Sequence, residues 1–208
     1  MFISFEGIDF CGKSTQVEML KQHLLKKNKR VEVIREPGGT EISEIVRNIL
    51  LDKKHNKMFM ETEIFLFSAS RAQLVREKIR PYLAQGIYVI SDRFHDSTTA
   101  YQGYGRGISI EAVKHINYLA IGNTIPDITF IIDIPFEVAQ MRREKRGEEL
   151  LDRIEITEGG FYDRVRNGYL SIAEKDDRFC VIDGTKTVEQ IHKLIVDEID
   201  VLEKREFA

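Results

Sequence analysis

Five short apolar runs divide the chain, and stretches in which apolar residues recur at helical spacing lie between them. The runs occupy residues 1–5, 30–34, 87–90, 127–134 and 178–182. Compact apolar runs of this length are typical of strands that a parallel sheet buries on both faces. Because these strands alternate with helices, the pattern predicts an α/β fold in which helices cover both faces of a parallel sheet.

Apolar stripes predict the positions of the helices. The first helix follows residue 13, a long one runs from about residue 61 to 85 with a bend near Pro81, and the last covers residues 191–202. Further helices are expected after Thr40, before Gly122, after Pro135 and up to about residue 175. The 208 residues contain no repeat and no linker, so we expect a single domain over residues 1–208.

The most informative motif joins the first strand to the first helix. Residues 7–14 read GIDFCGKS and fit the phosphate-binding pattern GxxxxGK[ST]. Gly7 and Gly12 permit backbone conformations in which successive N–H groups point at a polyphosphate. Lys13 would reach the β- and γ-phosphates, and the Ser14 hydroxyl, next to Thr15, would bind Mg²⁺.

The alternative for this loop is a glycine-rich turn that matches the pattern by chance. The strand before it and the helix after it favour triphosphate binding. The residues assigned to ATP on this ground are Gly7, Ile8, Asp9, Phe10, Cys11, Gly12, Lys13, Ser14 and Thr15.

Two polar residues follow the third apolar run. Ligands of open α/β sheets bind beyond the carboxyl ends of the strands, and Asp92 and Arg93 occupy this position. Asp92 could hold Mg²⁺ directly or through water, and Arg93 could bind a phosphate through two hydrogen bonds. A structural ion pair is the alternative, but the phosphate loop favours the functional interpretation.

Phe67 and Arg71 lie four residues apart and therefore share one face of the long helix. Arg71 on that apolar face requires a partner, because an unpaired buried cation is very costly. An aromatic ring beside a guanidinium could stack on a base and bind its carbonyl edge. A salt bridge to a nearby acidic residue explains Arg71 equally well, and the spacing does not decide between the two.

A charged stretch extends from residue 142 to 155. Arg142, Arg143, Arg146 and Arg153 alternate there with acidic residues. This composition favours a solvated helix with salt bridges. The functional alternative is a mobile lid that brings an arginine to the transferring phosphoryl group.

Charge and composition restrict the partners. The chain has 31 Lys and Arg against 34 Asp and Glu, and its net charge of -3 gives no reason to expect binding to nucleic acid or to an anionic membrane. The N-terminus shows no export signal and no apolar run approaches membrane-spanning length, so we expect a cytoplasmic protein. Cys11 and Cys180 cannot form a metal site by themselves, and a disulfide is not expected in the cytosol.

Several motifs together resemble the thymidylate kinases, a branch of the P-loop nucleoside monophosphate kinases. They are FEGID at 5–9, REPGGT at 35–40, LFSASR at 66–71, DRF at 92–94, STTAYQG at 97–103 and LDRIE at 151–155. The resemblance covers essentially the whole chain. It implies a five-stranded P-loop fold and transfer of the ATP γ-phosphate to dTMP with Mg²⁺, which gives dTDP and ADP for dTTP biosynthesis. It also implies a homodimer.

The same resemblance assigns roles around the acceptor. Phe67 matches the ring that stacks on thymine and Arg71 the residue that contacts a thymine carbonyl, which decides between the two interpretations of Arg71. Arg93 resembles the arginine that grips the acceptor phosphate, with Arg47 as a second contact to it. Asp92 resembles the carboxylate beside the metal.

Four more matches concern the nucleoside. Asp9 resembles the acid that meets the 3′-hydroxyl of the deoxyribose. Tyr101 matches the aromatic residue against the 2′ position of the sugar, where it disfavours ribonucleotides. Thr98 and Gln102 resemble further contacts to the nucleoside.

Position 10 separates this chain from part of that family. Some thymidylate kinases have an arginine directly after the loop acid and few basic residues in the lid. This chain has Phe10 there and an arginine-rich lid at about residues 142–157, so it resembles the bacterial subclass in which the lid supplies the catalytic cation. Arg153 or Arg146 would be that residue, and Arg142 is assigned to ATP.

Two other functions are compatible with the phosphate loop. A kinase for another nucleoside or nucleotide, such as a deoxynucleoside kinase of similar architecture, would phosphorylate thymidine but not dTMP. A regulatory ATP-binding module without an acceptor would require neither Phe67 with Arg71 nor Tyr101, and it would produce no dTDP.

Overall fold

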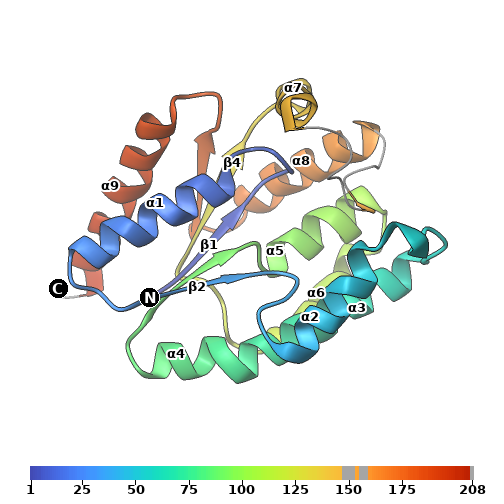
Figure 1. The fold of residues 1–208 in the computed structure, drawn as a ribbon, viewed down its shortest axis with the longest axis horizontal. Coiled ribbons are helices and arrows are strands. Elements are labelled where there is room, and N and C mark those ends of the chain that lie inside the picture. The colour runs from blue at the N-terminus through green and yellow to red at the C-terminus, as the bar shows by residue number, and fades with distance from the viewer. Residues whose placement is uncertain (147–152, 155–158, 207–208) are drawn as a thin grey trace.

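One parallel sheet of five strands lies at the centre of the computed structural model, which describes residues 1–146, 153–154 and 159–206 (Figure 1). The strand order is β2-β3-β1-β4-β5. The strands are β1 Phe2–Glu6, β2 Val31–Arg35, β3 Tyr88–Asp92, β4 Ile128–Asp133 and β5 Phe179–Asp183. Each predicted strand is present, and the parallel sheet is confirmed.

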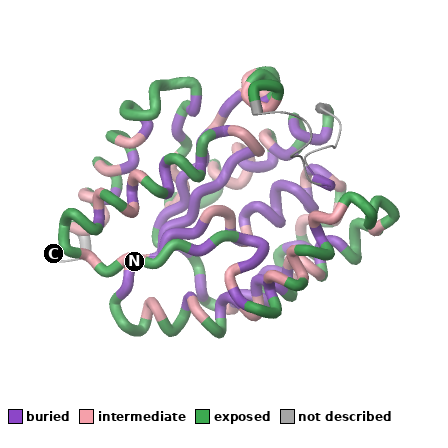
Figure 2. Tube along the Cα trace, viewed as in Figure 1, coloured by how far each residue is buried: buried purple, intermediate pink, exposed green. Residues whose placement is uncertain are grey.

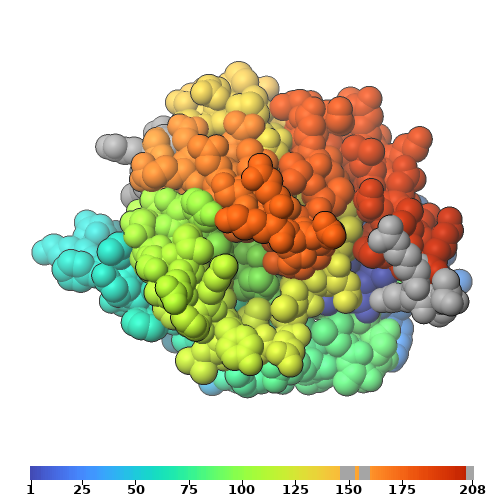
Figure 3. All heavy atoms as spheres, turned by 180° about the vertical axis from the view of Figure 1, so that it is seen from behind, coloured from blue at the N-terminus to red at the C-terminus, as the bar shows by residue number. Residues whose placement is uncertain are grey.

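Helices cover both faces of this sheet. Helices α1 and α9 lie side by side on one of them (Figure 1). In the view from behind, α8 packs against the chain that follows β3, in agreement with the contact between α8 and Thr99–Gly105 (Figure 3). The helices are α1 Lys13–Lys26, α2 Glu41–Leu51, α3 Met60–Leu74, α4 Arg80–Ala84, α5 His95–Thr98, α6 Ile110–Ile121, α7 Phe136–Arg146, α8 Gly159–Ala173 and α9 Val188–Glu206.

The strand register brings the polar residues at the strand ends to one edge of the sheet. Arg35 at the end of β2 pairs with Asp92 at the end of β3. Asp133 at the end of β4 pairs with Asp183 at the end of β5. Since these are the carboxyl ends of parallel strands, the edge is the position at which ligands of this class of fold bind.

The side chains of β1 alternate between the two faces of the sheet, as a strand requires. Ile3 and Phe5 belong to the same core cluster as Leu20 of α1, whereas Phe2 packs in a second cluster with Leu74 of α3. The three central strands β3, β1 and β4 are largely buried, whereas the edge strands β2 and β5 and the outer sides of the helices carry exposed residues (Figure 2). Glu6 shares the face of Phe2, so its carboxyl group is directed into the interior close to the edge of the sheet.

The long helix predicted over residues 61–85 consists of three segments. Helix α3 continues into a π-helical stretch at Val75–Ile79 and then into α4. Pro81 lies in the first turn of α4, where a proline removes no backbone hydrogen bond of that helix.

A wide π-helical turn, Thr99–Gly105, follows α5 directly. Gly105 packs so closely on Phe161 of α8 that a Cβ atom at this position would lie 2.6 Å from the ring. Turns of this kind are frequent at functional sites. This one carries Tyr101 and Gln102, two of the residues assigned to the nucleoside.

Only part of the predicted lid, residues 142–157, lies within the described structure. Helix α7 continues to Arg146, and Arg153 and Ile154 are described, whereas residues 147–152 and 155–158 lie outside the described residues. Within the described ranges, no helix is long and apolar enough to cross a membrane.

Candidate active site

The phosphate loop adopts backbone conformations that its glycines make possible. Gly7 has a φ of 135°, and a Cβ atom there would lie 2.5 Å from the carbonyl oxygen of Ile132. Gly12 has a φ of 102° directly before α1. Lys13 is buried, and its Nζ donates to the carbonyl oxygens of Gly7 at 3.2 Å and Ile8 at 3.0 Å. The loop therefore encircles its own lysine at the positive end of the helix, which is the geometry that binds polyphosphates.

Two cavities adjoin at this loop. The loop cavity is lined by Asp9, Phe10, Gly12, Lys13, Ser14, Thr15, Asp92, Arg93 and Arg142. The second cavity, of about 280 Å³, extends away from it between α3 and the π-helical turn. It is lined by Asp9, Ser14, Arg35, Glu36, Pro37, Arg47, Leu51, Phe67, Arg71, Asp92, Arg93, Ser97, Thr98, Tyr101, Gln102 and Ile154. Asp9, Ser14, Asp92 and Arg93 line both cavities, so ligands bound in the two would meet at these four residues.

Ser14 and Asp92 are joined at that meeting point. The Ser14 hydroxyl donates to Oδ2 of Asp92 at 2.8 Å. A hydroxyl and a carboxylate side by side form an oxygen donor set of the kind that holds Mg²⁺ together with phosphate oxygens and water. The predicted metal ligands are thus brought together by the start of α1 and the end of β3.

Arg93 is held in the left-handed region, with a φ of 69°, which is uncommon for a residue with a side chain. Its Nη2 forms an ion pair with Oδ1 of Asp9 at 2.5 Å, and its Nη1 donates to the carbonyl oxygen of Gly7 at 2.9 Å. Burial acts to raise the pKa of Asp9, but Arg93 and Lys13 outweigh it and hold the pKa below its ordinary value. Arg93 thus forms an ion pair at the end of β3, with the loop acid Asp9, and it also lines both cavities.

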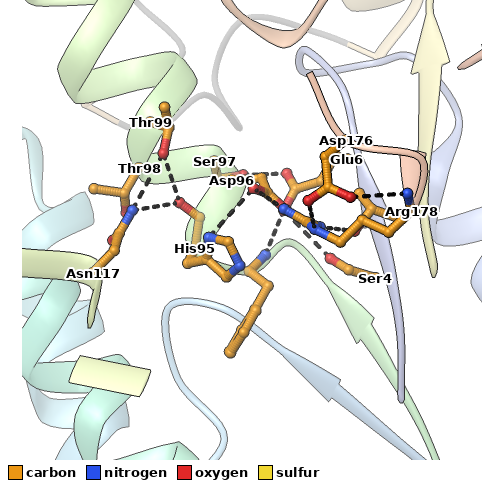
Figure 4. Close-up of polar contacts among 12 residues, drawn as sticks. Ser4, Glu6, His95, Asp96, Ser97, Thr98, Thr99, Asn117, Asp176 and Arg178 are labelled. Carbon is orange, nitrogen blue, oxygen red and sulfur yellow. Dashed lines mark hydrogen bonds and ion pairs between the residues drawn. The ribbon is translucent and has the colours of Figure 1, made fainter. Parts of the chain in front are cut away.

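A buried polar cluster that includes Glu6, Asp96 and Ser97 is shown in Figure 4, and it contacts Arg93 through Ser97. Glu6 accepts hydrogen bonds from the Phe94 N–H at 2.7 Å, the Ser97 hydroxyl at 2.6 Å and the Tyr169 hydroxyl at 2.8 Å. Ser97 and Tyr169 in turn lie 3.2 Å from Nη1 of Arg93. Burial and the neighbouring Asp96 raise the pKa of Glu6. The cluster thus connects β1 and α8 to the guanidinium in the site.

The same cluster extends away from the site through Asp96. Its carboxylate oxygens accept from Nη1 and Nη2 of Arg178, each at 2.8 Å. Arg178 directly precedes the edge strand β5. This ion pair, with two hydrogen bonds between the guanidinium and the carboxylate, therefore joins α5 to the β5 edge of the sheet. The start of α5 is thereby a rigid support for Ser97 and Thr98, which line the second cavity.

Arg71 forms the salt bridge that was one of its two interpretations, and it also lines the second cavity. The side chain is 1% exposed, and its Nε donates to Oε2 of Glu36 at 2.6 Å in a buried ion pair. Its Nη1 donates to the Thr98 hydroxyl at 2.8 Å. Arg71 and Phe67 nevertheless both line the second cavity, as their spacing on α3 predicts. The ion pair orients the guanidinium and does not withdraw it from the cavity.

Glu36 is expected to make the stability of the fold depend on pH. Burial raises the pKa of Glu36 to about 7 from 4.5, although Arg71 opposes the shift. The folded chain then holds a proton that the unfolded chain has released, so stability is lost as the pH rises from about 4.5 to about 7. Relative to Glu36→Gln, the free energy of unfolding of the natural protein should fall by about 3 kcal/mol across this window. Urea unfolding of both proteins at a series of pH values measures this difference. If the free energies of unfolding of the two proteins changed with pH in parallel, the prediction would be wrong.

Tyr101 and Gln102, which the resemblance assigns to the nucleoside, and Arg47, which it assigns to the acceptor phosphate, all line the second cavity. The Tyr101 hydroxyl donates to Oδ2 of Asp9 at 3.0 Å, which places the ring across the cavity from the loop. Gln102 is 2% exposed and donates from Nε2 to Oε1 of Glu63 at 2.9 Å. Nη1 of Arg47 donates to the carbonyl oxygen of Pro37 at 2.8 Å at the border of the cavity.

The arginines of the charged stretch occupy different environments. Arg142 donates to the carbonyl oxygens of Phe10 at 3.3 Å, Cys11 at 3.1 Å and Gly184 at 2.9 Å, and so borders the loop cavity. Arg153 is buried, with Nε 2.8 Å from the carbonyl oxygen of Leu50 and Nη2 2.6 Å from Oε2 of Glu63. The side chain of Arg146 lies outside the described residues. The solvated helix favoured by composition therefore does not describe Arg142 and Arg153.

Several site residues were not assigned from the sequence. Glu36 and Arg35 belong to the REPGGT motif, whose residues received no individual roles, and Ser97 opens the STTAYQG motif. Glu63 is four residues before Phe67 and eight before Arg71, so all three share one face of α3. This spacing was the available signal for Glu63.

The fold, the loop and the two adjoining cavities define a P-loop nucleotide kinase, an enzyme that holds a triphosphate beside a second ligand. A family model described as thymidylate kinase matches residues 5–195. The chain belongs to the thymidylate kinase family.

Individual relatives agree with this assignment. The chain is 50% identical over 201 residues to a thymidylate kinase of Kosmotoga olearia, with 95% of this chain and 94% of the relative covered. It is 48% identical over 200 residues to a thymidylate kinase of Caldanaerobacter subterraneus, with 96% and 94% covered. A crystal structure of thymidylate kinase from Ehrlichia chaffeensis is similar with a TM-score of 0.77 at 38% identity, and the match covers 96% of this chain and 98% of that one.

Proposed function

We propose that this enzyme transfers the γ-phosphate of ATP to dTMP, giving dTDP and ADP, as one domain over residues 1–208. The observation that carries the proposal is the border between the two cavities. Asp9, Ser14, Asp92 and Arg93 line both of them, so a triphosphate on the loop and a monophosphate in the second cavity would meet there. Phosphoryl transfer requires little more than this alignment and the compensation of negative charge.

The loop cavity supplies the donor side. Backbone N–H groups of the loop and the positive end of α1 would bind the phosphates, and Lys13 would turn from the loop carbonyls to the β- and γ-phosphates. Arg142, anchored on Phe10, Cys11 and Gly184, would border the nucleoside of ATP.

Mg²⁺ would be held by Ser14 and Asp92. Their hydrogen-bonded oxygen atoms fit an ion that takes few protein ligands and completes its shell with phosphate oxygens and water. When bound, the ion would offset charge on the transferring phosphoryl group.

The second cavity supplies the acceptor side. Phe67 is placed to stack on thymine and Arg71 to donate to a carbonyl of the base, with Thr98 and Gln102 beside them. Arg93 and Arg47 would bind the dTMP phosphate. Asp9 would meet the 3′-hydroxyl of the deoxyribose, and Tyr101, which donates a hydrogen bond to Asp9, would lie against the 2′ position and disfavour ribonucleotides.

Arg153 is our first candidate for the cation that the lid delivers. It is fastened to Glu63 on the acceptor side, so it would exchange this carboxylate for the phosphoryl group. We expect Arg153→Ala to lower kcat about 10²-fold or more and to change the KM for dTMP less than fivefold. Steady-state kinetics of Arg153→Ala and Arg146→Ala decide the matter: a loss of kcat in Arg146→Ala alone would assign the role to Arg146.

We also propose that the enzyme is a cytoplasmic homodimer. Exposed apolar side chains lie on α3 and on the two helices that contact it, with Ile45 of α2 at 58%, Phe65 of α3 at 60% and Leu119 of α6 at 79% exposure. A second copy of the chain would cover them. Sedimentation equilibrium should give twice the mass of the chain, and a monomer at micromolar concentration would contradict the proposal.

An assay coupled to ADP release, run across nucleoside and deoxynucleoside monophosphates, tests the acceptor. We expect dTMP to give the highest kcat/KM. Phosphorylation of thymidine but not of dTMP would favour a deoxynucleoside kinase. ATP binding with turnover of none of these compounds would favour an ATP-binding module.

A further inference from the structure

Glu63 is a buried carboxylate to which the established chemistry gives no task. It lies one turn before Phe67 on the face of α3 that lines the second cavity, and it is 2% exposed. Its Oε1 accepts from Nε2 of Gln102 at 2.9 Å and from Nε of Arg106 at 3.1 Å, and its Oε2 accepts from Nη2 of Arg153 at 2.6 Å. Three donors from three segments thus converge on one carboxylate.

The ionisation state of Glu63 follows from these neighbours. Burial acts to raise its pKa, but Arg106 and the other donors outweigh this and keep the pKa below its ordinary value. Two guanidinium groups are paired with the one carboxylate. Glu63 is therefore ionised at neutral pH and can only accept hydrogen bonds.

An acceptor at this position determines which way the Gln102 amide points. The two ends of a glutamine amide have the same shape, and only the partner distinguishes them. With Nε2 turned to Glu63, Oε1 is turned the other way, and Gln102 lines the cavity. Within the described part of the chain, no group donates to Oε1 of Gln102, so the cavity presents a hydrogen-bond acceptor there.

Arg71 provides the complementary donor. Four of its five N–H bonds are directed to Glu36, Thr98, Asn117 and the Phe94 carbonyl. One N–H on Nη2 has no acceptor among the described residues. A donor beside an acceptor matches a base edge with a carbonyl next to an N–H, as at O4 and N3 of thymine or uracil. Cytosine has the opposite order, an amino group at position 4 and an acceptor at N3.

We propose that Glu63 is a positioning residue for base selection: by holding the Gln102 amide with its oxygen toward the cavity, it admits thymine and rejects cytosine. This rests on the proposed function in one respect, that the acceptor base enters the second cavity. Glu63 does not touch the nucleotide and acts through Gln102.

The test compares Glu63→Gln with the natural enzyme on three acceptors. A glutamine at position 63 can donate as well as accept, so the Gln102 amide is free to turn and to offer N–H groups to the cavity. The ratio of kcat/KM for dTMP to that for dCMP should fall about tenfold or more. The ratio of dTMP to dUMP should stay unchanged, because both bases have the same N3–H and O4 edge.

Two controls distinguish this role of Glu63 from a non-specific effect of the substitution on the structure of the site. Arg106→Met removes one partner of Glu63 and leaves the contact with Gln102, so the ratio of dTMP to dCMP should be that of the natural enzyme. In a Gln102→Ala background, Glu63→Gln should produce no further change of the ratio. Glu63→Asp, which withdraws the carboxylate from Gln102 but keeps its charge, serves as the second variant and should lower the ratio in the same direction.

Equilibrium binding of dTMP and dCMP, measured by calorimetry, keeps the test independent of turnover. If the natural enzyme binds dTMP without phosphorylating it, the proposed function fails while the binding ratio still tests Glu63. Glu63→Gln or Glu63→Asp with the natural ratio would overturn the proposal. A change of ratio that persists in the Gln102→Ala background would overturn it as well.

Discussion

Lys13→Ala is expected to lower kcat by about 10³-fold, since a charge placed at the transferring phosphoryl group contributes several kcal/mol to the transition state. The buried amine lies within hydrogen-bonding distance of two loop carbonyls and directly beside the loop cavity. Removing it takes away one of the cations that line the loop cavity, beside Arg93 and Arg142. Steady-state kinetics at saturating ATP and dTMP measures the effect.

Lys26→Ala is the matched control for this variant. Lys26 lies in the last turn of the same helix, where its side chain is exposed. Its kcat should stay within about twofold of the natural value, because surface substitutions of this kind have small effects. If Lys13→Ala retained a natural kcat and a natural melting temperature, the loop would have no part in the transfer.

Arg93→Lys is expected to lower kcat/KM for dTMP by about 10²-fold or more, because a lysine cannot reproduce the two-pronged binding of a phosphate. The guanidinium bonds at once to Asp9, the Gly7 carbonyl and the Tyr169 hydroxyl. An ammonium group at this position would keep the charge but lose part of this set. The change should therefore be larger for dTMP binding than for ATP binding.

Arg166→Lys tests whether replacing any arginine that makes two hydrogen bonds to one carboxylate would lower kcat/KM for dTMP in the same way. Arg166 binds both oxygens of Asp133, at 2.7 and 2.8 Å, away from both cavities. This variant should have natural kinetics. Equal losses in both variants would mean that Arg93 acts on the fold and not on the acceptor phosphate.

The fold could be predicted from the sequence because the apolar runs, the apolar stripes at helical spacing and the glycine motif all indicate the same α/β arrangement. Strand β3, for example, begins with the apolar residues Tyr88, Val89 and Ile90, and the glycines of the phosphate loop lie between a strand and a helix, as the motif requires. The segments that could not be predicted in detail are those in which tertiary packing sets the backbone. In the π-helical turn Thr99–Gly105, Gly105 packs directly on Phe161, a residue 56 positions later in the sequence.

The sequence indicated which single residues to expect in the site but not which of them contact each other. Asp92 and Arg93 are adjacent in sequence, yet Asp92 pairs with Ser14 and Arg93 with Asp9. Spacing along one strand cannot show this, because Asp9 lies in the loop after β1 and Ser14 in the first turn of α1. The two explanations of Arg71 were likewise not exclusive, since a buried ion pair with Glu36 and a place in the cavity wall require the same orientation.

The residues that support the site were the hardest to find. Glu6, Glu36 and Glu63 are all buried carboxylates that hold an arginine, a glutamine or a hydroxyl in place. Apart from Ser4, which lies two positions before Glu6, their partners lie between 35 and 163 positions away in the sequence. Only the fold brings such groups together, so a motif can contain them without showing what they do.

The identity of the product tests the central claim most directly. Phosphorus NMR of the enzyme with ATP, Mg²⁺ and dTMP follows all phosphates at once. A site that aligns two nucleotides predicts dTDP and ADP in equal amounts, with little inorganic phosphate. ADP with inorganic phosphate and no dTDP would contradict it, because the second cavity would then hold no acceptor.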